Sequence, residues 1–430
     1  MNKNIIIVAP HFIPSNLAAV HRTRLFAKYL PDFGWTPIVL SVDESYYEEE
    51  LDENIHVLLS ENLRVEKVKA FDTKPIRLIG DIGIRGYLFL KRRILEIIKN
   101  EKIDFLYLTI PSHYIALLGR EIKKETGIPF GIDYIDPWVQ PVWHKDHKFL
   151  NRHWVSHKLS SFLEPKAVKN VSLITGVAEG YYQDVLDRNP KLKGKIITAA
   201  MPYGGEEEDF EKAKEIKLKK PLFENKEDKI QLIYAGAMLP KAFVVLEKVC
   251  QILKEKEDKY KNIEIHFIGS GTSPNDPNGF NIKPIAEEYG LWQTIIFEYP
   301  KRIPYLDVLV HLTNSDGVFI IGSTEAHYTP SKVYQGILAK KPVFAILHSA
   351  SSAYQVIKET NAGMVISFDG EKDTEKIYTT FESEFDEYIK FLNTYNFKEV
   401  NTESLEEYSA KKVTQTLVEA LNKAIKLPSF

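Results

Sequence analysis

Two hydrophobic patterns alternate along the first half of the chain. Short continuous apolar runs are typical of strands buried on both faces of a sheet, and stretches with helical spacing follow several of them. Strands are expected at residues 5–9, 37–40, 105–108, 129–134 and 172–175, and helices at 18–30 and 114–126. Strands that alternate with helices predict an α/β domain with a parallel sheet.

A second α/β domain is predicted after a charged, lysine-rich stretch at residues 204–229, which has the composition of a linker. The alternation then resumes, with strands expected at 230–235, 264–268, 294–297, 317–321 and 342–346, and helices at 243–254, 283–289 and 331–339. An amphipathic helix at about 404–425 ends the chain. The predicted architecture is therefore two Rossmann-like domains facing across a cleft, at 1–203 and 230–403, joined by a linker at 204–229 and followed by a C-terminal helix at 404–430.

The charge balance and the single cysteine narrow the class of protein. The chain has 56 Lys and Arg against 59 Asp and Glu, whereas a protein that coats nucleic acid carries a basic excess. Cys250 has no partner for an internal disulfide and falls in a helical pattern, which favours a buried structural thiol in a reducing, cytoplasmic compartment. No apolar stretch approaches the roughly 20 residues that a membrane-spanning helix needs.

Glycines follow two of the strands expected in the second half. Gly236 comes directly after residues 230–235, and Gly269 and Gly271 follow residues 264–268. Glycine at the carboxyl end of a strand lets a phosphate approach the backbone, although tight-turn geometry explains the same residues equally well. The third glycine of a dinucleotide fingerprint is missing, so an NAD-type site is not expected.

The segment Tyr-Thr-Pro-Ser-Lys-Val-Tyr-Gln at residues 328–335 is the most informative motif. Pro330 suits the first turn of a helix, which places Ser331 and Lys332 near its amino terminus. A helix start with an added hydroxyl and ammonium suits a diphosphate without a metal ion. The alternative is a capped helix with a solvated lysine.

This Pro-Ser-Lys helix, followed by Lys-Lys-Pro-Val at residues 340–343, resembles the donor-site segment of glycosyltransferase family 4-like enzymes (glycosyl transferases group 1), which have the GT-B fold. Further matching segments occur in the family's order, at residues 5–14, 22–30, 133–138, 200–210, 234–241 and 266–271. The resemblance implies that the first domain lies on the acceptor side, that the second binds the donor, and that the C-terminal helix packs back toward the first domain.

The resemblance also implies a chemistry. It implies that a sugar moves from a nucleotide sugar, UDP- or GDP-linked, to a glycan or lipid-linked acceptor in surface polysaccharide or glycolipid synthesis, without a metal ion and with retention of configuration. The candidate catalytic residues are His113 and Asp136. The candidate donor-binding residues are Gly236, Lys241, Gly269, Gly271, His327, Ser331, Lys332 and Gln335, and the candidate acceptor-side residues are His11, Asn16 and Arg22. For His113 and Asp136, a loop histidine without a role and a turn-capping aspartate are the alternatives.

Some residues depart from the family's pattern. His327 and Gln335 stand where the family carries two glutamates, Ala237 replaces an arginine, which leaves Lys241 as the cation of that loop, and the loop at 15–18 lacks a glycine pair. These departures keep open a catalytically silent relative that binds a nucleotide sugar or a partner protein. A GT-B sugar-nucleotide epimerase is a further alternative, although His327 and Gln335 supply none of the carboxylates that it needs.

Two stretches combine basic and aromatic residues, at 85–98 and 144–158. Such stretches on the first domain suit the diphosphate of a lipid-linked acceptor beside an anionic membrane, and so predict peripheral membrane contact. Solvated faces of amphipathic helices are the alternative. The histidines at 144–157 are too irregularly spaced for a zinc site.

Overall fold

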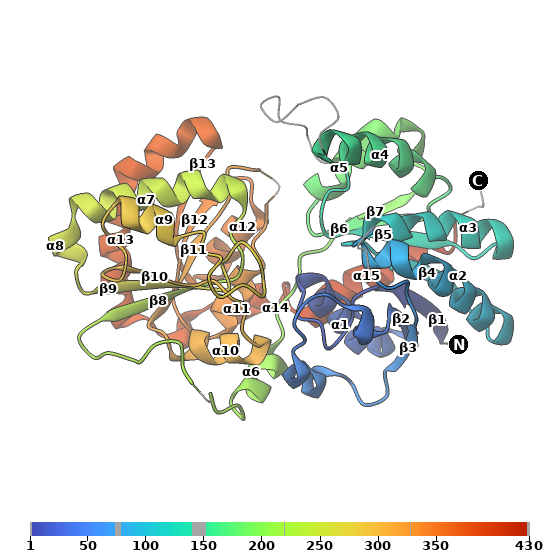
Figure 1. Cartoon of the computed structure of the whole chain (residues 1–430), viewed down its shortest axis with the longest axis horizontal. Helices are drawn as coiled ribbons and strands as arrows, with labels where there is room; N and C mark the ends of the chain where they lie inside the picture. The colour runs from blue at the N-terminus through green and yellow to red at the C-terminus, as the bar shows by residue number, and fades with distance from the viewer. Residues whose placement is uncertain (1, 74–78, 140–151, 219, 327, 428–430) are drawn as a thin grey trace. The chain divides into compact units, whose positions relative to one another are not determined.

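The computed structural model describes residues 2–73, 79–139, 152–218, 220–326 and 328–427, and the chain divides into two compact units (Figure 1). Unit 1 comprises residues 1–51, 59–203 and 410–430, and unit 2 comprises residues 52–58 and 204–409. The candidate His327 and residues 144–148 of the second basic stretch lie outside the described residues. The side chains of Arg152 and His153 also lie outside the described part of the structure.

Unit 1 is built on a parallel sheet with strand order β3-β2-β1-β4-β5-β6-β7. The strands are β1 (Lys3–Val8), β2 (Trp35–Val42), β3 (Arg64–Val68), β4 (Phe105–Thr109), β5 (Phe130–Tyr134), β6 (Leu173–Gly176) and β7 (Ile197–Ala200). The chain adds strands to one side of β1 and then to the other. A sheet of this kind has a topological switch point between β1 and β4, where ligands of α/β proteins commonly bind.

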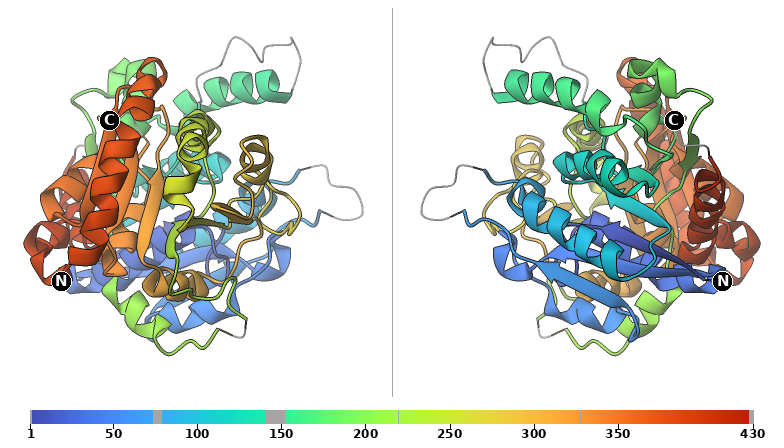
Figure 2. Two further views of the ribbon diagram at one scale, coloured as in Figure 1. Left: turned by 90° about the vertical axis from the view of Figure 1, so that its left-hand side faces the viewer. Right: turned by 90° about the vertical axis from the view of Figure 1, so that its right-hand side faces the viewer.

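The helices of unit 1 are α1 (Ala18–Tyr29), α2 (Ile82–Asn100), α3 (Ala116–Thr126), α4 (Arg152–Ala167), α5 (Gly180–Arg188) and α15 (Ala410–Ala424). Helices α2, α3 and α4 pack side by side in that order, as the right-hand view of Figure 2 shows for α2 and α3. Helix α15 packs against α1 and β7, which confirms that the C-terminal helix returns to the first half.

Unit 2 contains a second parallel sheet, with strand order β10-β9-β8-β11-β12-β13. The strands are β8 (Ile230–Ala235), β9 (Ile263–Ile268), β10 (Ile296–Tyr299), β11 (Gly317–Ile321), β12 (Val343–His348) and β13 (Gly363–Phe368). The helices are α6 (Glu207–Ala213), α7 (Phe243–Glu255), α8 (Glu257–Tyr260), α9 (Lys283–Glu288), α10 (Tyr305–Asn314), α11 (Lys332–Leu338), α12 (Ser352–Thr360), α13 (Thr374–Thr394) and α14 (Thr402–Glu406). The predicted α/β class of both halves is confirmed.

Two segments differ from the expected secondary structure. The segment expected as a linker contains α6. Its first turn carries Glu207, Glu208 and Asp209, and these carboxylates stabilise the helix because they lie at the positive end of its dipole. Asp209 is buried and accepts a hydrogen bond from the Tyr305 hydroxyl at 2.9 Å, so α6 is tied into unit 2. The single helix expected at 404–425 is two helices, α14 in unit 2 and α15 in unit 1.

Each unit has its own hydrophobic core. In unit 1 the core lines both faces of β1, where Ile5, Ile6 and Ile7 are fully buried. In unit 2 the sheet packs against α7 and α13, and Cys250 of α7 is buried among these side chains. Burial raises the pKa of the Cys250 thiol to about 12, which fits the expected structural role.

Arg22 is in the interior of unit 1. It is fully buried and forms a bidentate ion pair with Asp133, with N–O distances of 2.7 and 3.0 Å. Its remaining Nη1 group donates to the carbonyls of Met201 and Pro202, both at 2.8 Å. Arg22 therefore joins α1 to β5 and to the segment that directly follows β7. Because all its bonding groups face the protein interior, we assign it a structural role in place of the expected acceptor contact.

We predict that Arg22→Ala lowers the stability of unit 1 by about 3–5 kcal/mol, because it leaves the buried Asp133 carboxylate without its partner. The measurement is the urea midpoint for unit 1. Arg92→Ala removes an arginine whose side chain is 83% exposed and serves as the control, with a nearly unchanged midpoint. Equal midpoints for the two variants would contradict the structural role of Arg22.

Candidate functional site

Two turns with left-handed backbone follow neighbouring strands of unit 2. Gly236 after β8 has φ of 98°, and Gly269 after β9 has φ of 66°, conformations that favour glycine. The Gly236 N–H donates to the carbonyl of Ile268 at 2.7 Å, so the two turns are adjacent at the carboxyl edge of the sheet. This edge is where α/β sheets bind ligands.

The Lys332 side chain reaches from the start of α11 across the end of β8. Its Nζ donates to the Tyr234 hydroxyl at 2.8 Å and to the carbonyl of Ala237 at 2.9 Å, and lies 4.2 Å from the centre of the Tyr234 ring. A Cβ atom at Gly236 would lie 3.3 Å from Lys332 Cε. Glycine at position 236 therefore gives the lysine room to approach the strand end.

The electrostatic environment of Lys332 is unusual for a lysine. Burial lowers the pKa of its ammonium group to about 7. Its two hydrogen-bond acceptors are neutral, and no carboxylate among the described residues forms an ion pair with it. A half-buried cation without a countercharge is stabilised by an anion that reaches it.

A second lysine at this edge is paired with a carboxylate. Lys241, which lies between β8 and α7, has its Nζ 3.6 Å from Glu325 Oε1, and both side chains are about one quarter exposed (27% and 25%). Glu325 follows β11 and also contacts the Ser323 hydroxyl at 3.3 Å. Glu325 was not predicted, because alignment on residues 341–343 places His327 and Gln335 at the two glutamate positions of the family. The available signal was a carboxylate that follows a buried strand.

The turn after β9 is fixed by internal contacts. The Ser270 hydroxyl donates to Glu298 at 2.9 Å, and Glu298 also accepts three backbone N–H groups at the start of α9. A Cβ atom at Gly271 would lie 2.7 Å from the Pro300 carbonyl oxygen, so packing requires glycine there. At Gly269 the nearest contact would be 3.6 Å away. Of these two candidates, Gly269 has the more open surroundings.

Ser331 and Gln335 lie four residues apart at the start of α11 and so share one face of the helix. Both are half-buried. Ser331 is the residue before the first helical residue and makes no side-chain capping bond, and Pro330 precedes it outside the helix. The hydroxyl and the amide thus lie on the same short helix as Lys332.

In unit 1, His113 and Asp136 lie together at the ends of neighbouring strands, β4 and β5. The His113 Nε2–H donates to the Asp136 backbone carbonyl at 3.3 Å, and the imidazole stacks on Trp138 with ring centres 5.8 Å apart. Burial lowers the pKa of His113, so the ring is neutral at pH 7. The Asp136 side chain is exposed.

The loop after β1 holds a second polar cluster. His11 Nδ1 lies 2.7 Å from Glu49, and the buried Ser15 hydroxyl donates to the same carboxylate oxygen at 2.5 Å. Burial raises the pKa of Glu49, but the bonds from His11 and Ser15 outweigh it and lower the pKa to about 2. Asn16, the third candidate of this loop, contacts His21 at 2.9 Å. Glu49 lies in a run of three glutamates, which gave no sequence signal.

Two further properties concern the described residues alone. Among them, no group of three or more His, Cys, Asp or Glu side chains has the arrangement of a metal site. None of the described helices combines the length and apolarity that a membrane span requires.

The low pKa of Lys332 predicts a pH-dependent stability. An unfolded lysine keeps its proton up to about pH 10.4, whereas folded Lys332 releases it near pH 7. The unfolded state therefore binds more protons between these values, and the free energy of unfolding rises with pH across this window. Chemical denaturation at pH 7, 8 and 9 should show this rise relative to Lys332→Gln. Parallel pH profiles for the two proteins would refute the lowered pKa.

No protein-family model matches the chain, and no curated protein matches it by sequence. Solved structures do match along nearly the whole chain. A glycosyltransferase from Rickettsia africae ESF-5 aligns with a TM-score of 0.61 and 16% identity, covering 99% of this chain and 100% of its own. Sucrose-phosphate synthase from Thermosynechococcus elongatus aligns with a TM-score of 0.63 and 12% identity, covering 97% and 98%.

A third similar structure contains a nucleotide sugar. HepE from Anabaena in complex with UDP-glucose aligns with a TM-score of 0.60 and 12% identity, covering 97% of this chain and 99% of its own. At these identities the similarity is informative about the fold. The two parallel sheets and the full-length alignments show that this chain has the GT-B fold of these glycosyltransferases, as the sequence predicted.

Proposed function

We propose that this protein is a metal-independent glycosyltransferase that takes a sugar from a UDP- or GDP-linked donor. One observation carries the proposal: the half-buried Lys332 ammonium bonds two neutral partners at the carboxyl edge of the unit 2 sheet, next to the left-handed turn at Gly236. A nucleotide diphosphate supplies the countercharge that this lysine lacks. The similar HepE structure, which holds UDP-glucose, supports a nucleotide sugar as the ligand.

We assign the donor-binding roles from this lysine outward. Lys332 and Ser331 bind the diphosphate, and Gly236 and Gly269 let it approach the strand ends. Gln335, on the same helix face, hydrogen-bonds the ribose through its amide. Lys241 adds a second cation whose charge Glu325 moderates. Gly271 supports the turn through packing, and the position of His327 in sequence associates it with the sugar.

Leaving-group stabilisation in this proposal needs no metal ion. As the bond between the sugar and the diphosphate breaks, negative charge grows on the diphosphate. A fixed ammonium in a poorly solvated position stabilises that charge more than it stabilises the ground state. Binding also raises the pKa of Lys332, because the anion favours the charged form, so donor binding takes up a proton near neutral pH.

The acceptor side is assigned to unit 1. His113 and Asp136 are proposed to contact the sugar and the acceptor hydroxyl, and His11 and Asn16 the remainder of the acceptor. Glu49 holds His11 Nδ1, which leaves Nε2 to meet a hydroxyl. We further propose retention of configuration and, as acceptor, a glycan or a lipid-linked glycan of surface polysaccharide or glycolipid synthesis at the cytoplasmic face of a membrane.

A second candidate function is nucleotide-sugar binding without turnover. The absence of glutamate at His327 and Gln335 favours it. Glu325 of the same loop provides one carboxylate beside Lys241, and this favours an active enzyme. A donor-hydrolysis assay separates the two, because only the enzyme releases free sugar.

The donor is identified with a thermal-shift panel of UDP-, GDP-, ADP- and TDP-sugars, followed by hydrolysis and by proton NMR of the anomer released to an acceptor. We expect the nucleotide sugars of one base to raise the melting temperature of the protein. We also expect the protein to hydrolyse that donor and to transfer its sugar with retention of the anomeric configuration. Stabilisation without turnover supports the binding protein, an inverted anomer refutes retention, and a flat panel refutes the donor site.

The pH dependence of donor binding tests Lys332 itself. Because the bound diphosphate needs the ammonium form, affinity for the nucleoside diphosphate should fall by up to about tenfold per pH unit above pH 7. Lys332→Arg keeps its charge at every pH and should abolish this slope. Lys332→Ala should weaken binding at pH 7 by on the order of tenfold to a hundredfold. Titration calorimetry from pH 6.5 to 9 measures both effects.

The control for this titration is Lys358→Ala, which removes an exposed lysine of α12 in the same unit. It should bind like the wild type. A wild-type affinity that does not change with pH, or a Lys332→Ala variant with unchanged affinity, would contradict the diphosphate role.

A further inference from the structure

The Tyr234 hydroxyl and the Lys332 ammonium belong to a closed set of hydrogen bonds at the end of β8. Lys332 Nζ donates to the Tyr234 hydroxyl at 2.8 Å and to the Ala237 carbonyl at 2.9 Å. The Tyr234 hydroxyl in turn donates to the same carbonyl at 3.2 Å. The three groups therefore bond one another in a triangle, and displacing any one of them breaks two hydrogen bonds.

The Tyr234 ring is fixed by the core of unit 2. The side chain is fully buried, and its cross-strand partner on β9 is Phe267, whose ring centre lies 5.2 Å away. Phe267 is itself fully buried, whereas Ala237, at the other end of the triangle, is exposed. The hydroxyl is thus held at the boundary between the close-packed core and the exposed turn that follows β8.

The Tyr234 hydroxyl is an uncharged partner for the lysine. Burial raises the pKa of Tyr234 well above its usual value, so the phenol keeps its proton at neutral pH. An ammonium group has three N–H donors, and the triangle uses two of them. Within the part of the chain that the structure describes, no acceptor takes the third. Protonated Lys332 therefore has an uncompensated charge and one N–H for an anion.

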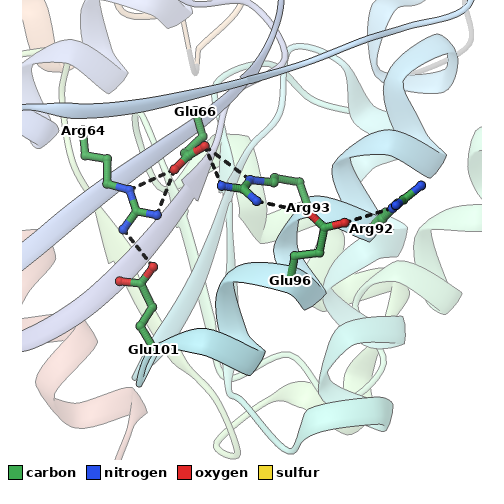
Figure 3. Close-up of polar contacts among 6 residues, drawn as sticks. All are labelled: Arg64, Glu66, Arg92, Arg93, Glu96 and Glu101. Atoms are coloured by element: carbon green, nitrogen blue, oxygen red, sulfur yellow. Dashed lines mark hydrogen bonds and ion pairs between the residues drawn. The ribbon is translucent and has the colours of Figure 1, made fainter.

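Several other cations of the chain are held by carboxylates instead. On α2 and β3 of unit 1, arginines and glutamates alternate in a continuous network of ion pairs (Figure 3), formed by Arg64, Glu66, Arg92, Arg93, Glu96 and Glu101. In unit 2, Lys241 faces Glu325. A carboxylate in place of the Tyr234 hydroxyl would cancel the charge of Lys332 in the same way. A phenol holds the ammonium without cancelling its charge.

We propose that Tyr234 is the positioning residue of Lys332 and keeps its ammonium charged and in place for the phosphate groups of the ligand. This inference rests on the proposed function, in which Lys332 binds the donor diphosphate. Tyr234 acts through the lysine: its ring centre lies 4.2 Å from Nζ and its hydroxyl accepts an N–H, and both contacts favour the charged form. Without the hydroxyl, the pKa of Lys332 falls below the value of about 7 that burial gives it.

The first test is the titration of Lys332 in the full chain without a nucleotide. Trace labelling with acetic anhydride acylates only the neutral amine, and mass spectrometry gives the rate at Lys332 as the pH changes. Tyr234→Phe removes the hydroxyl and keeps the ring, and should lower the pKa of Lys332 by about one pH unit. Tyr388→Phe is the matched control, because Tyr388 is fully buried in the same unit and donates to the Pro342 carbonyl at 2.9 Å. It should leave the titration of Lys332 unchanged.

The second test is the binding of UDP and GDP, measured by titration calorimetry from pH 6 to 8. A pKa lower by one pH unit reduces the protonated fraction of Lys332 about fivefold at pH 7. Tyr234→Phe should therefore bind the nucleotide that the wild type binds about fivefold more weakly at pH 7. The difference should shrink to about twofold at pH 6 and approach tenfold at pH 8, whereas a purely structural hydroxyl would give a constant difference.

Three results would overturn the role of Tyr234. They are the same titration of Lys332 in the wild type and Tyr234→Phe, an equal shift in Tyr388→Phe, or a difference in nucleotide affinity that does not change with pH. Failure of the proposed function is seen separately, because Lys332→Ala would then bind UDP and GDP like the wild type. The labelling of the nucleotide-free protein still reports whether the Tyr234 hydroxyl controls Lys332.

Discussion

Parallel strands in one sheet all end at the same edge, and the candidate site of each unit follows from this constraint. In unit 2 it brings Gly236, Gly269 and Glu325, which are far apart in the sequence, to the ends of β8, β9 and β11. In unit 1 it brings the His11 loop, His113 and Asp136 to the ends of β1, β4 and β5. The central strands of each sheet are buried and largely apolar, so the candidate chemistry lies in the connections that follow them.

Within that frame, Lys332 has the most specific environment. A lysine loses solvation when it is buried, and here two neutral oxygen acceptors and an aromatic ring replace the lost water in part. The solvation that these contacts do not replace lowers the pKa of the Lys332 ammonium group to about 7. An arrangement that is unfavourable in the free protein becomes favourable when an anion binds, which is why we propose a diphosphate as the ligand of Lys332.

The fold was predictable because buried strands and amphipathic helices leave clear hydrophobic patterns. Strands β1, β5 and β8 fall within a few residues of the expected ranges. The edge strands β3, β7 and β13 were missed, because each is only partly buried. Site residues were harder to place. Gly236 and Lys332 were found from motifs, but the Glu325–Lys241 and Glu49–His11 pairs depend on long-range contacts that no local pattern encodes. The structural role that we assign to Arg22 rests on its buried contacts with Asp133, Met201 and Pro202, because a structural arginine and a ligand-binding arginine look alike in a sequence.

We propose that Lys332 is the cation that meets the donor diphosphate. A crystal structure of the full chain with the nucleoside diphosphate that stabilises it most tests this directly. We expect a phosphate oxygen within hydrogen-bond distance of Lys332 Nζ, beside the turn at Gly236. A diphosphate bound elsewhere, with Lys332 still bonded only to Tyr234 and Ala237, would contradict it.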